Sequence, residues 1–522
     1  MALRVDAAGP LVQKPTVELK VQAPSNEGGG AAVGDIKESN DAKKADEKSY
    51  EEEERSSKQS KEKSKSSKKT WRFFLETVYK LNPNLKNGRL NLHKAQEGLR
   101  QAWLEFSPTI AGVANISGEK RTDSVEIAGQ EKRETNWGYG LQLNQNLFAS
   151  GGTQARIQKG RAAYDSALNG MYARESQVLL ETFNAFLEVI VARELRDSAQ
   201  SNQSLSVDLV NQAKTKVAAG EISPADLSLA RANLAESQAK MAAAIARLEV
   251  AKAQLECLIL TPFNAEELVW PDSSIFSLED ILPNGESTFD STKERDAFAL
   301  AVEKGNFTLK EAQRDVHATR YEVRSQLAQH MLPSADMQAE LMKSDSDAKI
   351  GSGPDMKRRP FLMRVSAHLR IPLSLGRQQS LVRQSEQALS EKNLSFQQLI
   401  LTTRAQALQA FHQRRSARSN MKRFKIEWEA NEEALRAMQE RYKQGDTTLI
   451  NVTEVQARLL TSRQNYLEAQ KQYMYESFRV RQLAGRFTAK DLRLAVAYYN
   501  PKDYNPRFGL TPKRFKVDLV RD

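Results

Sequence analysis

Apolar and polar side chains alternate with a period of two in parts of this chain. The clearest stretches are FLMRVSAHLRIPL at 361–373 and WGYGLQLNQNLF at 137–148. Strict alternation predicts strands with one apolar and one polar face. The polar face of the first stretch carries Arg364, His368 and Arg370. The apolar faces of the two stretches carry Trp137, Tyr139, Leu141, Leu143, Phe361, Met363, Val365 and Leu369.

Two further stretches, at 109–117 and 334–342, alternate less cleanly and precede the first two. Loops rich in charge and glycine separate the members of each pair, which predicts two hairpins. Alternation alone also fits a soluble sandwich with one wet face. The strands are about 10 to 13 residues long, which suits a tilted strand in an outer membrane. No second layer is available to cover their apolar face, and aromatic residues stand at strand ends as in an interfacial girdle. The pattern therefore favours membrane strands.

Long runs with a helical period follow each predicted hairpin. About 65 residues without proline lie between a glycine turn, at 150–152 or 375–377, and Gly220 or Gly445. A helix of that length extends about 100 Å, and glycine suits the left-handed position after its last turn. A second helix of about 35 residues follows each of these turns. Alanine-rich apolar stripes between charged faces predict coiled-coil packing with neighbouring helices.

A further helix is expected before each hairpin. The first begins near Trp71 and stops before Pro108, because proline disfavours helical geometry in the residue ahead of it. Its counterpart opens with a capping-box spacing at 291–294 and ends before Pro333. The helical content therefore exceeds the strand content by far.

The folded part of the chain is an internal duplication. A shift of 225 positions places Pro108 on Pro333 and Gly220 on Gly445, without a gap over roughly 150 residues. The fold class is accordingly mostly α with a small β part, duplicated within the chain. The expected organisation is a disordered charged tail at 1–70, a first repeat at 71–262, a connector at 263–291, a second repeat at 292–487 and a C-terminal extension at 488–522.

Composition narrows the possible functions. The tail at 1–70 has almost no large apolar side chains and cannot offset the entropy of ordering. It shows no apolar segment of a signal peptide, and no stretch of about 18 apolar residues that would make a transmembrane helix occurs in the chain. The net charge of +11 suits a nucleic acid, but Lys and Arg alternate with acidic residues and form no basic face interleaved with aromatics. No nucleic-acid partner is expected.

Residues for catalysis or metal binding are scarce. Cys257, the one cysteine, excludes a disulfide framework and suits a small apolar position in a helix. The glycines at 28–34 follow no strand and open no helix, so they do not form a nucleotide fingerprint. The histidines have no metal-ligand spacing, so no enzyme, cofactor or metal is expected. They are His93, His317, His330, His368 and His412.

A unit of two hairpins cannot close a barrel and would expose its edges. Three copies would give twelve strands, and the long helices would continue below them as a tube. With this arrangement the chain resembles the TolC family of outer-membrane efflux and type I secretion channels. The resemblance covers about 71–506. It rests on the order and spacing of NPNL, QNLFASGG, IPLSLGR, KVAAGEISPADLSLARANLAES, RYKQGDTTLINVTEVQARLLTS and LAGRFTAKDLRLAVAYYNPKDY.

The resemblance implies a homotrimer with a twelve-stranded barrel in the bacterial outer membrane and a helical tunnel through the periplasm. Such a protein is a passive exit duct of an efflux pump or a type I secretion system, and LRLAVAYYNP leans to the secretion branch. The implied partners are outer-membrane lipid, a periplasmic adaptor (membrane fusion) protein and an inner-membrane pump or ABC transporter. The implied adaptor-contacting turns contain Gly220, Glu221, Ile222, Gly445, Asp446 and Thr447.

The resemblance also implies a gate at these turns. Asn451 and Glu454 stand where the family often carries two acidic residues around the aperture, although Asn451 departs from the acidic pattern. Asp226 and Tyr442 stand where the family links helix pairs that part on opening. Without the resemblance, Asp226 simply caps a helix that begins after Ser223, and Glu454 acts likewise near the next helix start. Both roles are compatible.

Two other classes of function remain open. A soluble, elongated coiled-coil scaffold would explain the missing signal peptide but would leave the apolar strand faces uncovered. A basic nucleic-acid adaptor would bind in a manner that weakens steeply with salt. Cell fractionation with detergent extraction separates the first of these from the channel.

Overall fold

The computed structural model describes residues 69–122, 131–272, 276, 292–350, 356–373 and 376–504. The described residues fall within one compact unit, Lys68–Asp522. The expected charged tail lies outside them up to residue 68, and so does Ser291 of the expected capping box. None of the helices in these ranges combines the length and the apolar composition that crossing a membrane requires.

Each half begins with a broken helix, so the prediction of one continuous helix before each hairpin is wrong. The breaks lie at Asn82 and Asn306, whose backbones are extended. Each side chain caps the helix that follows: Oδ1 of Asn82 accepts from the amide of Asn84, and Oδ1 of Asn306 from that of Leu309. Pro83 then occupies the first helical position. The helices are α2 (Trp71–Leu81), α3 (Pro83–Leu104), α6 (Thr292–Gly305) and α7 (Phe307–Met331).

The strands form one antiparallel sheet. β1 pairs with β2, β2 with β3, and both β4 and β5 with β3. The two predicted hairpins are confirmed, and the β2–β3 pairing joins them. The expected length of 10 to 13 residues is wrong for β1, β2 and β3, which have 14, 18 and 17 residues, because pairing continues past the apolar segment into charged residues. The bounds are β1 (Thr109–Thr122), β2 (Glu131–Phe148), β3 (Ser334–Ile350), β4 (Met356–Arg358) and β5 (Phe361–Arg370).

The register confirms that the predicted apolar residues share one face of this sheet. Leu341 in β3 lies opposite Leu141 in β2 and Met363 in β5. On the other face, Glu340 lies opposite both Gln142 and Arg364. Residues directly opposite each other in a ladder point to the same side, so the alternation in each strand becomes one apolar and one polar face of the whole sheet.

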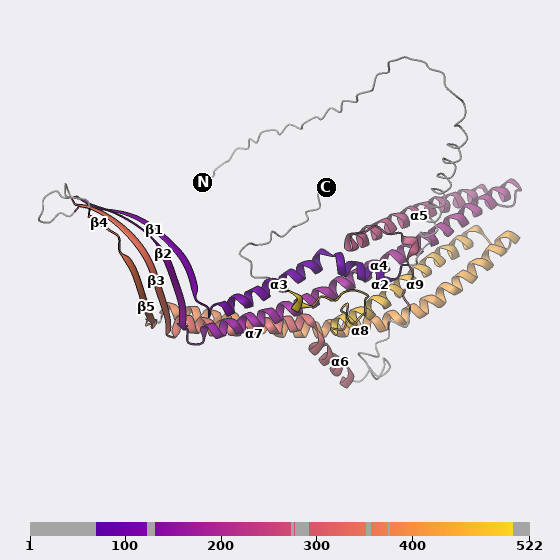
Figure 1. Cartoon of the computed structure of the whole chain (residues 1–522). Coiled ribbons are helices and arrows are strands. Elements are labelled where there is room, and N and C mark those ends of the chain that lie inside the picture. Colours follow the sequence, from indigo (N-terminus) through magenta and orange to yellow (C-terminus); the bar gives the residue numbers. More distant parts are fainter. Residues whose placement is uncertain are drawn as a thin grey trace, which may run out of the picture. The chain divides into compact units, whose positions relative to one another are not determined.

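Two long helical hairpins make up most of the molecule (Figure 1). α4 has 67 residues and α8 has 69, close to the expected 65, and each packs along the shorter helix that follows it. α4 also packs against α7 and α9 and so connects the two halves. Figure 1 shows the strands at one end of the helices and the two turns at the other. The helices are α4 (Gly152–Ala218), α5 (Pro224–Ile259), α8 (Gly376–Gln444) and α9 (Leu449–Leu483).

The breaks at Asn82 and Asn306 join the ends of helices into columns. Nδ2 of Asn82 donates to the carbonyl of Leu258 at the end of α5 (3.1 Å), and Nδ2 of Asn306 donates to that of Leu483 at the end of α9 (3.0 Å). The two acceptors are 225 positions apart (483 − 258) and the two donors 224 (306 − 82), so the repeat found in the sequence relates equivalent contacts with one residue of slippage at the donors. α3 thus continues from α5 and α7 from α9, beside the unbroken α4 and α8.

The largest apolar core surrounds the middle of α4. Phe183 and Phe186 of α4 are packed there with Phe74 of α2 and Phe478 of α9. The described part of the C-terminal segment, 488–504, contributes to the same core. This described part of the expected extension is therefore packed into the folded body. A buried carboxylate fixes it, since Glu175 accepts a hydrogen bond from the amide of Ala489 at 2.7 Å.

Candidate functional site at the helical tips

The two glycine turns have the predicted left-handed geometry. Gly220 has φ of 77° and Gly445 has φ of 86°. The next amides reach back to the last helical turns: that of Glu221 donates to the carbonyl of Lys216, and that of Asp446 to the carbonyl of Arg441, each at 2.9 Å. These bonds satisfy carbonyls that a helix end leaves free. A β-carbon at either glycine would be strained.

The starts of the following helices differ between the two turns. Oγ of Ser223 accepts from the amide of Ala225, and Asp226 accepts from the amide of Ser223, which completes a capping box. Thr448 makes no side-chain cap at the start of α9. Asn451 instead donates to Oγ1 of Thr447 at 3.1 Å. The expected capping role of Asp226 is confirmed, and the second turn is the less firmly held of the two.

A buried apolar cluster, named here the tip cluster, joins the two hairpins behind these turns. Ile222 of the first turn is packed against it. The tip cluster is built by α4, α5, α8 and α9, so both hairpins lose apolar contact area if they separate. Its buried members are Leu209, Val210, Ala213, Ala230, Leu435, Tyr442, Leu449 and Val452.

Lys216 supplies the polar contact across the tip cluster. Its Nζ donates to the main-chain carbonyl of Tyr442 at 2.8 Å and lies 4.7 Å from the centre of the Tyr442 ring. Glu221 is 3.9 Å from the same Nζ. Sequence reasoning did not identify Lys216 as a functional residue. The signal that was available is its alignment with Arg441 under the 225-residue shift, directly before each terminal turn.

Tyr442 is almost fully buried, with 2% of its surface exposed. Its hydroxyl has no hydrogen-bond partner among the described residues. Burial raises the pKa of Tyr442, and the negative charge of Asp226 raises it further. Asp226 is thus close enough to influence Tyr442, while its carboxylate hydrogen-bonds to its own helix start. The expected pair is close in space without a hydrogen bond between the two side chains.

The other two gate candidates lie on an exposed face of α9. The carboxylate of Glu454 pairs with Arg458, one turn further along, at 2.6 Å. More than half of the Glu454 side chain is exposed, and Asn451 is exposed as well. Exposed ion pairs of this kind contribute little to stability, so Glu454 is available to act on solvent or ions beside the second turn.

Polar contacts continue between α4 and α9 away from the tips. Nε2 of Gln456 donates to Oδ1 of Asn202 at 2.8 Å, and Lys471 pairs with Glu188 at 2.8 Å. Arg247 of α5 also contacts Glu188, at 2.7 Å. Burial alone would raise the pKa of Glu188, but hydrogen bonds from Lys471 and Arg247 outweigh burial and lower it. This seam fastens the second hairpin to the first along its length.

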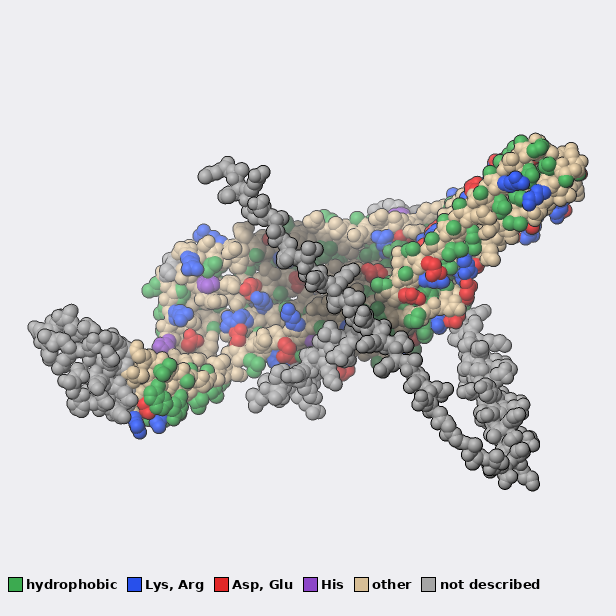
Figure 2. Space-filling view, turned by 90° about the horizontal axis from the view of Figure 1, so that it is seen from above, with side chains coloured by type: hydrophobic (Ala, Val, Ile, Leu, Met, Phe, Trp, Pro, Cys, Tyr) green, Lys and Arg blue, Asp and Glu red, His purple; other side chains and the backbone are tan. Residues whose placement is uncertain are grey.

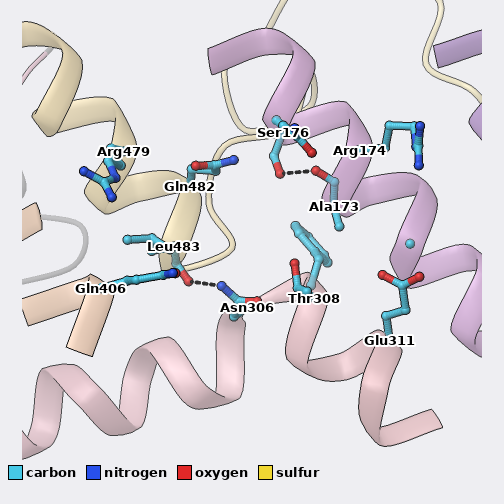
Figure 3. Close-up of a pocket in the computed structure, with 13 residues that line it drawn as sticks. Ala173, Arg174, Ser176, Asn306, Thr308, Glu311, Gln406, Arg479, Gln482 and Leu483 are labelled. Carbon is cyan, nitrogen blue, oxygen red and sulfur yellow. Dashed lines mark hydrogen bonds between the residues drawn. The ribbon is translucent and has the colours of Figure 1, made fainter. Parts of the chain in front are cut away.

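A polar pocket of about 400 Å³ lies where α7 continues from α9. Figure 3 shows Arg174 and Arg479 on opposite sides of it, with Asn306 between them and Glu311 on α7. Burial raises the pKa of Glu311, and the nearby Asp315 adds to this effect. Asn306, which lines the pocket, bonds through its side chain to the carbonyl of Leu483 and the amide of Leu309, so the pocket lies at the joint between α9 and α7.

The remaining predicted residues lie on the two faces of the sheet that the alternation predicts. Trp137, Tyr139 and Phe361 are exposed on its apolar face. On the polar face, His368 lies opposite Asp336, and its Nε2 is 3.1 Å from Oγ of Ser366. Glu340 opposite Arg364 and Asp336 opposite His368 reduce the positive charge that sequence alone suggested for this face.

Comparison with known proteins gives a family match in each half of the chain. A family model described as outer membrane efflux protein matches residues 75–259 and 301–486. The two matched segments coincide with the two structural repeats and include both tip turns. The family model therefore matches each of the two repeats found in the sequence.

Individual relatives agree with this match. The outer membrane efflux protein BepC of Brucella suis biovar 1 (strain 1330) is 24% identical over 437 residues, which cover 82% of this chain and 88% of BepC. The CmeC outer membrane channel of Campylobacter jejuni superposes with a TM-score of 0.64 at 16% identity, covering 79% of this chain and 84% of CmeC. For the outer membrane protein VceC of Vibrio cholerae the TM-score is 0.63 at 15% identity, with coverage of 80% and 96%. The predicted mostly helical fold with a small antiparallel sheet is confirmed.

Proposed function

The chain belongs to the outer membrane efflux protein family, and we propose that three copies of it form the exit duct of a tripartite efflux pump. Proteins of this family are channels of the bacterial outer membrane, so the chain is a passive conduit and not an enzyme. BepC is named as an efflux protein and CmeC as an outer membrane channel, which supports efflux over the secretion branch suggested by LRLAVAYYNP.

The proposal of a trimer rests on the shape of the sheet. The sheet is four strands wide, and it has one apolar face and two unpaired edges. Among the described strands, β1 and β5 each pair on one side, and β4 and β5 occupy the same position beside β3. A free edge in a membrane leaves backbone groups without partners, at a cost of several kcal/mol each. Closure with the edges of neighbouring copies removes every edge, and three copies give twelve strands (3 × 4).

The two faces of the sheet acquire distinct surroundings in such a barrel. We assign the apolar face, with Leu141, Met363 and Leu369, to lipid and the polar face, with Arg364, His368 and Arg370, to the water-filled lumen. A barrel with outward apolar and inward polar residues is the common arrangement of outer-membrane strands. The helices then extend into the periplasm, and the hairpin loops point outwards.

The tip turns lie at the opposite end and suit the docking of a periplasmic adaptor. We assign this contact to Gly220, Glu221 and Ile222 of the first turn and to the stretch from Gly445 to Thr447 of the second. Six turns, three of each kind, would meet around the axis of a trimer. The inner-membrane pump supplies the energy, because proteins of this family are passive conduits.

The gate is assigned to the same end. Glu454 and Asn451, both exposed on α9, line the aperture in this proposal, while Asp226 and Tyr442 sit at the contact between hairpins that must part. The tip cluster and the Lys216 hydrogen bond hold this contact closed. Separation of α8 and α9 from α4 widens the aperture.

Cell fractionation tests the proposed function. The expected result is recovery of the full chain in the outer-membrane fraction as a trimer that dissociates on heating, with ion conductance after insertion into a planar bilayer. Recovery as a soluble species without conductance would establish the elongated scaffold instead. A matched sample with Leu141→Asp and Met363→Asp, which place charges on the apolar face, is expected to lose membrane insertion.

A further inference from the structure

A lysine interrupts the apolar face of the sheet. The register places Lys343 of β3 directly opposite Tyr139 of β2 and Phe361 of β5. The preceding position on this face of β3, Leu341, lies between Leu141 and Met363. Lys343 therefore follows immediately after the apolar segment, in a row whose other large side chains are aromatic.

The next row adds a second cation. Asp345 lies opposite Trp137, and Nε of Arg359 is 4.0 Å from the Asp345 carboxylate. The Arg359 side chain is 71% exposed, so most of its donors face outwards. Lys343 is exposed, and its side chain makes no ion pair or hydrogen bond with any residue that the structure describes. Figure 2 shows hydrophobic side chains gathered on the strands with basic ones at their margin.

Three exposed aromatic side chains form an apolar surface beside Lys343 and Arg359. The rings of Trp137 and Tyr139 stack with centroids 6.2 Å apart. Trp137, Tyr139 and Phe361 are 45%, 51% and 69% exposed. Tryptophan and tyrosine favour the level of lipid headgroups, where an apolar ring meets a wet polar edge.

The position along the strands fixes the side of the membrane. From Leu369 to Phe361 the apolar alternation spans eight residues, about 27 Å along a strand. Lys343 and Arg359 lie at the end of this segment next to the hairpin loops, away from the helices. In the barrel of the proposed function, on which this step rests, that end lies in the outer leaflet.

We propose that Lys343 and Arg359, framed by Trp137, Tyr139 and Phe361, bind the phosphate of an outer-leaflet lipid. A cation at the edge of the hydrocarbon is costly unless it meets an anion or water, and cations beside a membrane attract anionic headgroups. The carboxylate of Asp345 attracts Arg359 from 4.0 Å, and the exposed donors of Arg359 stay accessible to a ligand. The acyl chains of the same lipid cover the apolar rows that begin at Leu341. A trimer would carry three such sites.

Native mass spectrometry of the full-length protein in detergent tests this site. The probes are a diphosphorylated glucosamine lipid (lipid A) and the same lipid with both phosphates removed. The wild type is expected to bind the phosphorylated lipid preferentially. Lys343→Gln and Arg359→Gln are each expected to weaken this binding about fivefold, from about 1 kcal/mol per cation near the surface. Arg364→Gln, on the opposite face of the same sheet, is the matched control and is expected to bind like the wild type.

Equal binding of the two lipids by the wild type overturns the proposal, and so does unchanged binding in the double variant. If a glutamine variant fails to assemble, the comparison of the two lipids on the wild type still tests the proposal. Lys343→Arg keeps the charge and is expected to retain the preference for the phosphorylated lipid. Conductance of the wild type in a planar bilayer of neutral lipid tests the proposed function separately. A trimer that conducts but binds both lipids equally would support the proposed function and contradict the proposed lipid site.

Discussion

Lys216, near the end of α4, donates a hydrogen bond from Nζ to the main-chain carbonyl of Tyr442 at 2.8 Å and lies over the Tyr442 ring. The two residues are 226 positions apart (442 − 216) and belong to different helical hairpins. Because the acceptor is a backbone group, the contact fixes the path of α8 at its tip. The hydrogen bond must break if the hairpins part there.

Lys216→Met is expected to favour the open duct. The variant keeps the apolar stem over the ring and removes the charged donor. A hydrogen bond from a charged group contributes about 1.5 kcal/mol or more, so its loss shifts the closed-to-open equilibrium about tenfold. Single-channel recording in a planar bilayer measures this as a longer open time or a larger mean conductance. Lys214→Met, which removes an exposed lysine two residues before Lys216, is expected to record like the wild type.

Glu454→Ala is expected to raise single-channel conductance or change the cation leak. Glu454 is exposed beside the second turn, and three copies would form a ring of carboxylates at the aperture. Removal of a charged ring alters both the width and the local ion concentration of a narrow pore. Glu440→Ala, which removes an exposed carboxylate of α8 that pairs with Lys443, provides the comparison. Conductance equal to that of the wild type would exclude an aperture role for Glu454.

Asn306→Ala is expected to loosen the joint between α9 and α7. It removes a helix cap, which costs about 0.5–2 kcal/mol, and leaves the carbonyl of Leu483 without its donor. Asn306→Asp keeps the cap but loses the donor to Leu483. Its melting temperature should therefore fall between those of Asn306→Ala and the wild type. Circular dichroism melts of the detergent-solubilised proteins measure the order of the three melting temperatures. A melt of Asn306→Asp equal to that of the wild type would show that the bond to Leu483 has no role.

Glu476→Gln is expected to stabilise the protein at high pH. Glu476 is almost fully buried in α9, and one of its oxygens has no partner among the described residues. Burial raises the pKa of Glu476 above 4.5, although Arg479 acts in the opposite direction. A raised folded-state pKa contributes stability below pH 4.5 that is lost as the pH rises through the folded pKa.

The pH dependence separates this effect from a change in packing. The melting temperature of Glu476→Gln should exceed that of the wild type most at pH 8, by an amount that corresponds to about 1 kcal/mol. The difference should vanish well below pH 4.5, where the wild-type carboxyl is protonated in both the folded and the unfolded state. Glu440→Gln is the exposed control and should show no such trend. A constant difference at all pH values would contradict ionisation as the cause.

The duplication and the long helices could be predicted from the sequence because both leave strong periodic signals. The 225-residue shift, the left-handed glycines and the capping box at Ser223 are all present in the structure. The breaks at Asn82 and Asn306 were missed although Pro83 and Gly305 stand beside them, and the side-chain bonds that hold the breaks cross from one helix to another. Strand lengths were underestimated because backbone pairing continues where alternation fades.

The candidate site was predictable only in part. The turns follow from local glycine and capping chemistry, whereas Lys216 acts through a backbone carbonyl 226 positions away, which no local pattern reports. Asp226 and Tyr442 were placed by resemblance and lie close in space, but the hydrogen bond to Tyr442 across the tip cluster comes from Lys216. Contacts that involve a second copy of the chain have no signal in a single sequence beyond an uncovered face or edge.

Disulfide crosslinking between β1 and β5 tests the central claim that neighbouring copies close the barrel. In a Cys257→Ser background, one cysteine replaces Val113 in β1 and a second replaces, in turn, each position from Leu362 to His368 in β5. The pair Ala339→Cys and Val365→Cys, opposite each other within one chain, reports that oxidation works. Barrel closure predicts covalent dimers and trimers on non-reducing denaturing gels for one register of β1 against β5. Monomers alone at every position, with the internal pair oxidised, would contradict it.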